Sequence, residues 1–339
     1  MKCDIIIPVW NQLELTRECI KSIIRKTHYP YRLVIIDNGS DARTHAYLES
    51  LKETEGVHLI RNEDNIGFVK AVNQALKVSD SPFICIMNND TVATDGWLRE
   101  MVDVANLKEE IGLVNPSSNN LGQHKESSTI DDYAAKLKRS KGEYIEMGAC
   151  IGFCMLFKRE LFNKLGYLDE IYKEGNFDDT DYSRKAEKEG YLCVRAKGTY
   201  VYHNMKSSFA KVKNYEQSFK RNQEVFNRRW GRPKRLLYIV TKSHGKLFDW
   251  MRDDIYKKAR GGNWVWLFFK GHNEKPQMPE HSNMKLFYLS PLFFELNCIT
   301  RILKKKKPFD SVYVDDPGLI RKIKRFDKSH KHETILMGG

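Results

Sequence analysis

The 339-residue sequence lacks an apolar run long enough to cross a membrane as a helix. Such a helix needs ~18 or more consecutive apolar residues. The richest stretch, residues 286–302, is interrupted by Ser290-Pro291 and contains Glu295. The N-terminal apolar run, residues 5–7, is too short for a signal peptide and has no small-residue cleavage site after it. We therefore expect a cytoplasmic protein.

Cysteine is scarce and irregularly placed, with seven residues scattered along the chain. Several lie in apolar runs, where an unpaired cysteine behaves as a small hydrophobic side chain. Cys150 and Cys154 lack the second pair of ligands that a zinc site needs. This usage indicates a reducing compartment and argues against a zinc site.

The first part of the chain lacks an excess of positive charge, whereas the last part is strongly basic. Residues 1–203 contain 27 Lys and Arg against 31 Asp and Glu, whereas residues 204–339 contain 30 against 13. A basic segment suggests a negatively charged partner: anionic membrane lipid, a phosphate-bearing acceptor or nucleic acid. The sequence has no helix-turn-helix, zinc or aromatic RNA-binding pattern, so no nucleic-acid partner is expected.

A lysine run at residues 304–307 directly follows an apolar segment at residues 286–303. Lysine runs are most often solvated faces. Beside an apolar segment, such a run can also contact an anionic membrane surface, at ~1 kcal/mol per basic residue near the lipid. Peripheral attachment at the inner face of the membrane is therefore a second expectation for localisation.

Short apolar runs alternate with amphipathic segments through the first part of the chain. Strands are expected at 4–9, 31–37, 57–61, 83–87, 147–156, 192–196 and 199–202, and helices at 14–25, 44–54, 67–78, 158–165 and 181–189, with an exposed polar loop at 116–146. This alternation indicates βαβ units and an α/β fold, with a doubly wound, mostly parallel sheet flanked by helices.

A second alternation begins near residue 235, which predicts two units: residues 1–230 and a basic C-terminal α/β extension, residues 231–339. Strands are expected there at 236–241, 264–269 and 311–314, helices at 246–259 and 317–326, and a partly helical stretch at 285–303. These strands are too few for a complete nucleotide-binding domain. They resemble the opening of a second Rossmann-like unit.

Polar residues follow the expected strands of the first unit at their carboxyl ends, where ligands bind in doubly wound sheets. They are Asn11, Asp37-Asn38-Gly39, the segment from Asn62 to Gly67, and Asn88-Asn89-Asp90. Asp90 is placed to ligate a divalent cation, which takes hard oxygen ligands and is commonly completed by substrate phosphates. The cluster Asp178-Asp179-Thr180-Asp181 offers a carboxylate that could act as a general base.

Seven motifs occur in an order that resembles glycosyltransferase family 2, whose fold is GT-A. They lie at residues 6–11, 35–40, 65–68 with Asn73, 87–90, 152–169, 177–181, and 190–191 followed by 202–209. The resemblance covers residues 3–230. It is closest to the rhamnosyltransferase-like branch, which builds bacterial surface polysaccharide.

The resemblance implies an inverting, metal-dependent hexosyltransferase of cell-envelope polysaccharide synthesis. The donor would be a UDP- or dTDP-sugar, the acceptor a hydroxyl of a glycan or lipid-linked molecule, and the cofactor Mg²⁺ or Mn²⁺.

The family's site residues map onto this chain position by position. Pro8, Trp10, Asn11, Asp37, Asn38, Asn65, Gly67, Lys70 and Asn89 would bind the nucleotide sugar, with Asp37 accepting the pyrimidine N3–H. Asp90 and His203 would ligate the metal, and Asp179 would be the catalytic base. Asp178 and Asp181 are candidate acceptor-side residues. Apart from the resemblance, Trp97 closely follows the strand of the metal motif, which makes it a third candidate for an acceptor contact.

Two positions depart from the family's pattern. The metal motif usually begins with Asp, but Asn88 and Asn89 stand there, so the site has fewer negative charges. The catalytic pair is usually Glu-Asp, but here it is Asp178-Asp179, which leaves Asp181 as a rival base.

Simpler explanations exist for the same residues. Asn88-Asn89-Asp90 and Asp37-Asn38-Gly39 are also good turn sequences. The acidic run could begin a helix, because acids favour the positive end of the helix dipole. His203 could be a packed side chain, and Trp97 a core residue.

Two rival functions also stay open. A nucleotidyltransferase should carry a Gly-rich phosphate loop near its N-terminus, whereas this chain has Pro8-Val9-Trp10-Asn11. The second rival is a binding module with a non-catalytic nucleotide-binding fold, tethered to membrane or nucleic acid by its basic segment.

Overall fold

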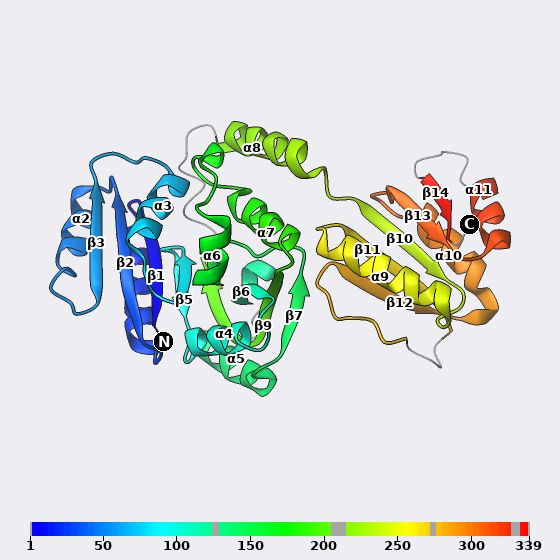
Figure 1. The fold of residues 1–339 in the computed structure, drawn as a ribbon, viewed down its shortest axis with the longest axis horizontal. Helices are drawn as coiled ribbons and strands as arrows, with labels where there is room; N and C mark the ends of the chain where they lie inside the picture. Colours follow the sequence, from blue (N-terminus) through cyan, green and yellow to red (C-terminus); the bar gives the residue numbers. More distant parts are fainter. Residues whose placement is uncertain (1, 124–128, 205–214, 272–275, 327–332, 338–339) are drawn as a thin grey trace. The chain divides into compact units, whose positions relative to one another are not determined.

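The computed structural model describes residues 2–123, 129–204, 215–271, 276–326 and 333–337 (Figure 1). The chain forms two compact units, which we call the first unit (residues 1–145 and 149–231) and the second unit (residues 146–148 and 232–339). The motif residues 207–209 lie outside the described part. None of the described helices is both long and apolar enough to span a membrane.

The first unit contains a large mixed sheet flanked by helices, which confirms the expected fold class (Figure 1). The strand order is β3-β2-β1-β4-β8-β6-β9-β5, and β7 pairs with β9 beside this path. The strands are β1 (Cys3–Val9), β2 (Tyr31–Asn38), β3 (Val57–Asn62), β4 (Phe83–Met87), β5 (Thr91–Ala93), β6 (Ile111–Ser117), β7 (Tyr144–Met147), β8 (Cys154–Lys158) and β9 (Leu192–His203). The helices are α1 (Leu13–Lys26), α2 (Ala42–Glu49), α3 (Phe68–Val78), α4 (Trp97–Ala105), α5 (Ile130–Leu137), α6 (Arg159–Leu165), α7 (Asp178–Lys188) and α8 (Tyr215–Trp230).

The centre of this sheet is parallel and buried on both faces. Strand β1 pairs in parallel with β2 and β4, and all seven of its residues are buried. Alternate residues of β1, including Ile5 and Ile7, join a core with Cys19 and Ile23 of α1. Because the order reverses at β1, a switch point for ligand binding lies between β1 and β4 at their carboxyl ends.

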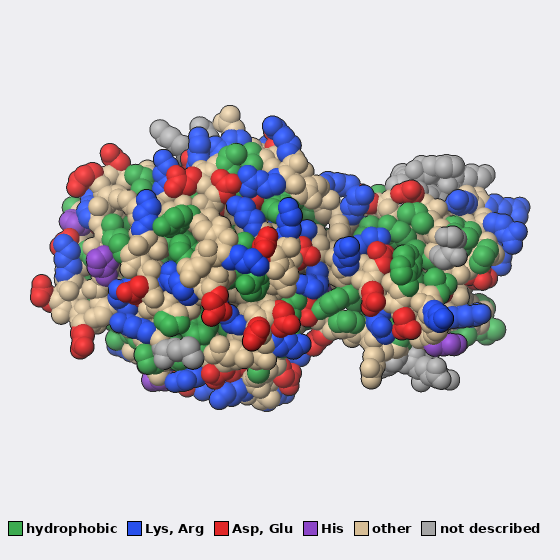
Figure 2. Space-filling model, viewed as in Figure 1, with side chains coloured by type: hydrophobic (Ala, Val, Ile, Leu, Met, Phe, Trp, Pro, Cys, Tyr) green, Lys and Arg blue, Asp and Glu red, His purple; other side chains and the backbone are tan. Residues whose placement is uncertain are grey.

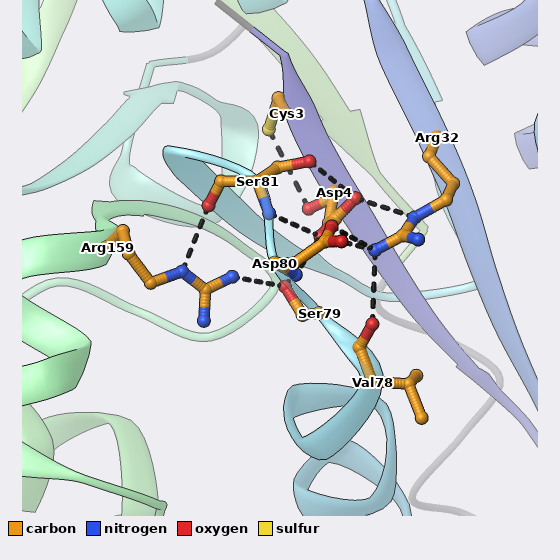
Figure 3. Close-up of polar contacts among 8 residues, drawn as sticks. All are labelled: Cys3, Asp4, Arg32, Val78, Ser79, Asp80, Ser81 and Arg159. Carbon is orange, nitrogen blue, oxygen red and sulfur yellow. Dashed lines mark hydrogen bonds and ion pairs between the residues drawn. The ribbon is translucent and has the colours of Figure 1, made fainter.

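An ion-pair network fixes the opposite, amino-terminal edge of β1 (Figure 3). The buried Asp4 carboxylate accepts two 2.9 Å hydrogen bonds from Arg32, and others from the Ser79 and Ser81 hydroxyls at 2.7 and 2.8 Å. Arg159 in turn donates to the Ser79 hydroxyl at 2.6 Å. Burial alone would raise the pKa of Asp4, but the bonds from Arg32 and the two serines outweigh it and lower that pKa to about 2.

The second unit contains a parallel five-stranded sheet in the order β12-β11-β10-β13-β14. Its strands are β10 (Arg235–Val240), β11 (Trp264–Lys270), β12 (Met284–Leu289), β13 (Ser311–Val314) and β14 (Glu333–Leu336), and its helices are α9 (Lys246–Arg260), α10 (Phe294–Leu303) and α11 (Pro317–Phe326). Leu236 and Tyr238 of β10 face a core that includes α9, whereas Leu237 and Ile239 face α10 and α11. In chain order this is a 3-2-1-4-5 sheet, as in the Rossmann fold.

A three-residue segment from the middle of the chain belongs to this second unit. Glu146 donates its backbone N–H to the Glu280 carbonyl at 3.4 Å, and Ser282 donates to the Glu146 carbonyl at 2.8 Å. The second unit is therefore built from two separate stretches of sequence.

Several elements differ from the sequence expectation. The predicted strand at 147–156 is interrupted: β7 ends at Met147 and β8 begins at Cys154, and residues 151–153 between them line the pocket described below. Residues 192–203 form one strand, whose register to β6 shifts at Pro116/Ser117. Residues 285–289 are strand rather than helix, and β14 was not predicted, so the second unit has more strands than expected. Both β12 and β14 are sheet edges with mixed burial, which weakens the sequence signal.

Candidate active site

A cavity of ≈ 530 Å³ lies in the first unit at the carboxyl ends of β1, β2 and β4. Its walls also include the residues before β8, the loop before α7 and the end of β9. It is lined by Pro8, Val9, Trp10, Asn11, Gln12, Asn38, Asn65, Gly67, Phe68, Asn88, Asn89, Asp90, Asn120, Ile151, Gly152, Phe153, Glu174, Gly175, Asn176, Asp178, Asp179 and His203. The structure thus brings most of the sequence-predicted residues into one pocket.

The rim after β1 is held in an unusual backbone conformation. Asn11 and Gln12 have φ values of 58° and 63°, in the left-handed region that few side chains favour. Asn11 is fixed on both sides, since its N–H donates to the Ser40 hydroxyl at 2.9 Å and its side-chain oxygen accepts the Asp41 N–H at 2.7 Å. Trp10 beside it is 37% exposed at the pocket, where an aromatic face could stack on a base.

Asp37 is fully buried and does not line the pocket. Its oxygens accept the Ser40 N–H at 3.0 Å and contact His45 at 2.8 Å and Arg61 at 2.6 Å. Burial would raise the pKa of Asp37, but the bonds from Ser40, His45 and Arg61 lower it below its usual range. The carboxylate is therefore charged and fixed directly behind Asn38.

An amide network joins the ends of β2 and β3 to the start of α3. Asn38 donates to the Asn65 side chain at 2.8 Å and accepts from Asn62 at 3.0 Å. Gly67 has a φ of 89°, and a Cβ there would lie 3.0 Å from the Lys173 carbonyl oxygen, so any other residue would crowd this wall.

Asp90 and His203 meet at the floor of the pocket. The Asp90 Oδ1 and His203 Nε2 atoms are 3.1 Å apart, and the Asn88 side-chain nitrogen is 3.4 Å from the same Nε2. The imidazole stacks on Phe153, with ring centroids 5.3 Å apart. Asn89 is anchored by a 2.9 Å bond to the Thr16 hydroxyl.

These residues fit a divalent cation only as a partial ligand set. No three His, Cys, Asp or Glu side chains in the described ranges form a group that could hold a metal. One carboxylate, one imidazole and neighbouring amide groups are nevertheless suitable donors, and a phosphate-bearing ligand can fill the other positions. The donor chemistry therefore suits a cation that binds together with a diphosphate.

Asp178 and Asp179 begin helix α7 and both line the pocket. Asp179 is held by the Gly152 N–H at 2.7 Å and the Thr180 N–H at 2.6 Å. Burial, followed by the adjacent Asp179 charge, raises the pKa of Asp178 to about 8. Burial also raises the pKa of Asp179, although these N–H donors oppose the rise. The two acids therefore ionise as a pair, in which one proton is retained near neutral pH.

The loop before α7 forms one wall of the pocket in a strained conformation. Lys173, Asn176 and Phe177 have φ values of 48°, 69° and 71°. Asn222 of α8, which is fully buried, donates to the Tyr172 and Gly175 carbonyls at 2.9 and 2.7 Å. Helix α8 therefore clamps the wall that carries Glu174, Gly175 and Asn176.

Three further predicted residues are not brought to the pocket. Trp97 is fully buried in the core and donates its indole N–H to Thr27 at 2.8 Å, which corrects its expected place on the acceptor side. Asp181 is also buried, and it accepts from Arg229 at 2.7 Å and Trp230 at 2.8 Å, so it is a structural anchor rather than a rival base. Lys70 is exposed on α3 and does not line the pocket.

Sequence reasoning missed Phe153, Asn222 and the wall at residues 174–176. Phe153 stood inside a recognised motif but was assigned no role. The only signal for the wall was Glu174-Gly175-Asn176, a turn composition. Nothing in the sequence connects Asn222 to this loop, because the two are distant along the chain.

Comparisons with known proteins show which sequences this chain resembles. Residues 4–166 match the sequence model of the family described as Glycosyl transferase family 2. The uncharacterized protein y4gI of Sinorhizobium fredii is 26% identical over 252 residues, which cover 67% of this chain and 27% of that protein. The poly-beta-1,6-N-acetyl-D-glucosamine synthase of Staphylococcus epidermidis is 22% identical over 169 residues, which cover 48% of this chain and 41% of that protein. The chain thus spans less than half the length of either relative.

Among solved structures, S. aureus TarS superposes with a TM-score of 0.50 at 16% sequence identity, over 68% of this chain and 40% of that chain. At this identity the likeness shows the fold alone, which is the mostly parallel GT-A sheet expected from the sequence.

Proposed function

We propose that the chain, whose residues 4–166 match the family model described as Glycosyl transferase family 2, transfers a sugar from a UDP- or dTDP-sugar to a hydroxyl of a glycan or lipid-linked acceptor in polysaccharide synthesis. The observation that carries this proposal is the meeting of two groups in one cavity: the Asp90–His203 pair and the Asp178–Asp179 pair. The first suits a cation that binds together with the leaving diphosphate, and the second suits a proton acceptor.

The nucleoside would lie between Pro8, Trp10 and Asn11. Asp37 would select the base by accepting the N3–H of uracil or thymine. A carboxylate has about four lone-pair positions, and three donors contact this one in the described structure. The Arg61 side chain, which is 27% exposed, would have to move for the base to reach the fourth.

Asp90 and His203 would hold Mg²⁺ or Mn²⁺ together with the diphosphate. Bound there, the cation would act as a Lewis acid that neutralises the charge developing on the leaving group. Asn65, Gly67 and Asn89 would border the ribose and diphosphate. Lys70 would need a different side-chain position to reach them.

Transfer would proceed in one displacement. Asp179 takes the proton of the acceptor hydroxyl while that oxygen bonds to the anomeric carbon. The bond from the anomeric carbon to the phosphate oxygen breaks, and the nucleoside diphosphate leaves with its electron pair. A single displacement inverts the anomeric centre. The Gly152 and Thr180 N–H groups would hold the carboxylate in place.

A panel of UDP-, dTDP- and GDP-sugars with Mg²⁺ or Mn²⁺ tests this proposal, with release of nucleoside diphosphate as the readout. Turnover is expected with a uridine or thymidine donor. Asp179→Asn should lower turnover ~10²–10⁴-fold with little change in donor affinity. The proposal fails if no uridine or thymidine donor binds or turns over. If Asp179→Asn keeps full activity, only the assignment of the base fails.

A further inference from the structure

Helix α10 of the second unit is apolar on two opposite faces. Phe294, Cys298 and Ile302 are buried against the sheet. On the outer side, Leu292 and Phe293 precede the helix, and Leu296 and Leu303 lie on it. These four side chains are 81%, 57%, 60% and 53% exposed, respectively. We call them the leucine ridge. Exposed apolar clusters of this kind mark contact surfaces.

The side of α10 next to the ridge is basic. A cavity of ≈ 350 Å³ there is lined by Trp266, Phe268, Phe287, Asn297, Thr300, Arg301, Lys304 and Lys305. Three of these lining residues are cations, and none of them is acidic. Within the described ranges, no carboxylate forms an ion pair with Arg301, Lys304 or Lys305.

The cations crowd one another around aromatic rings. The Lys305 ammonium lies 4.9 Å from the centroid of Trp266, and the Arg235 guanidinium lies 4.7 Å from the same centroid. Burial, and then repulsion from Arg235, Lys285 and Arg301, lowers the pKa of Lys305. Among the side chains that the structure describes, no carboxylate pairs with Arg301 or Lys305 to offset this positive charge.

The acidic residue nearest in sequence to the ridge does not change this balance. Glu295 follows Phe294 on α10 and pairs with Lys322 of α11 at 2.5 Å. Lys306 and Lys307 extend the basic run directly after the helix, and both are exposed. In the face drawn in Figure 2, hydrophobic and basic side chains of this unit reach the surface side by side.

We propose that the leucine ridge and the adjacent cations form a docking face for an anionic membrane surface. The ridge enters the boundary between headgroups and acyl chains, and Arg301 and Lys304–Lys307 contact anionic headgroups. This proposal is independent of the proposed sugar transfer.

Two other occupants fit the observations less well. A two-fold contact between copies of this chain would bring the same uncompensated lysines toward each other, which is unfavourable. Nucleic acid would engage the cations but would leave the leucine ridge in water. An anionic bilayer can contact both parts of the face, with its acyl chains against the leucine ridge and its headgroups against the cations.

Cosedimentation of the full chain with two kinds of vesicle tests the proposal: phosphatidylcholine alone, and an equal mixture of phosphatidylcholine and phosphatidylglycerol. Binding is expected to the mixed vesicles, to be weak on phosphatidylcholine alone, and to fall as salt rises. Leu296→Ser with Leu303→Ser should lower the partition coefficient at least ~10-fold, because two apolar side chains that enter the membrane are replaced by polar ones. Lys304→Gln with Lys305→Gln should lower binding to mixed vesicles and flatten its salt dependence.

Matched controls use equally exposed residues elsewhere. Leu107→Ser in the first unit, where the side chain is 50% exposed, and Lys257→Gln on α9 should bind as the unchanged chain does. Circular dichroism checks that the ridge variants fold. The proposal is overturned if the chain does not bind mixed vesicles, or if the ridge variants bind like the controls. It is also overturned if the chain is a dimer that the ridge variants dissociate.

Discussion

The Asp178–Asp179 pair shows how two adjacent carboxylates can take different protonation states. Asp178 is buried beside a second acid, so the pair retains a proton that an exposed aspartate would lose. A base needs to be ionised to accept a proton, and a proton held by Asp178 leaves the charge on Asp179.

Asp178→Asn should therefore leave the acidic limb of kcat/KM in place, because it replaces a carboxyl that is already protonated when Asp179 titrates. The variant should also lose the fall in stability that a buried acid with a pKa of about 8 causes as pH rises from about 4 to 8. A pH–rate profile and unfolding midpoints at pH 5 and pH 8 check both points. A shift of the acidic limb to lower pH would show that Asp178 is charged when Asp179 titrates.

Asp4 should make the opposite contribution to stability. Its pKa is lowered to about 2, so its stabilising effect is complete above the ordinary value of 3.8 and is lost as pH falls through 2. Asp4→Asn should lower the free energy of unfolding by roughly 2 kcal/mol at pH 7 and by much less at pH 2. Denaturant titrations at the two pH values measure this.

Asp80 provides the control for that experiment. It also pairs with Arg32, at 2.9 Å, but its side chain is 82% exposed. Asp80→Asn should change stability by less than about 1 kcal/mol at either pH. Equal losses in the two variants would mean that burial of Asp4 is unimportant.

At the scale of single elements, buried strands were the most predictable part of the fold. The strands Phe83–Met87 and Ser311–Val314 have the predicted bounds, because a short apolar run bounded by polar residues has few structural alternatives to a strand. Edge strands were harder, since β12 mixes buried and exposed positions without regular alternation. Helix α8 was not predicted. It holds the loop before α7 through contacts between residues that are distant in sequence.

That contact gives a prediction for α8. Asn222→Ala removes three hydrogen bonds to the strained loop before α7, so it should lower the free energy of unfolding by ~1–3 kcal/mol. It should also raise the KM for donor more than it lowers kcat, because the loop forms a pocket wall. Gln223→Ala, an exposed change on the same helix, should alter neither quantity. If Asn222→Ala lowers stability alone, the clamp does not shape the donor site.

The candidate site was largely visible in the sequence because its residues follow parallel strands. Pro8, Asn38 and Asp90 lie at or just after the carboxyl ends of three strands that are neighbours in the sheet, so their convergence follows from topology. Trp97 and Asp181 were also predicted as site residues from the sequence, but both side chains are buried and do not line the pocket. Sequence position does not reveal which side of a helix faces the core when polar residues such as Asp181 form buried anchors.

At the scale of the whole molecule, the two units have separate cores and should respond differently to ligand. Differential scanning calorimetry should show two transitions. Uridine or thymidine diphosphate with Mn²⁺ should raise the midpoint temperature of only one transition, because it stabilises that unit by ~2.7 kcal/mol at a ligand concentration of 100 Kd. Equal shifts of both transitions would show that the units unfold as one.

The segment at residues 146–148 has a consequence for synthesis on the ribosome. Its backbone N–H and carbonyl at Glu146 bond to residues 280 and 282, which emerge well over a hundred residues later. During translation the first unit can bury its core while these groups still bond only to water. The backbone hydrogen bonds of Glu146 can therefore form only after the chain has been synthesised as far as Ser282.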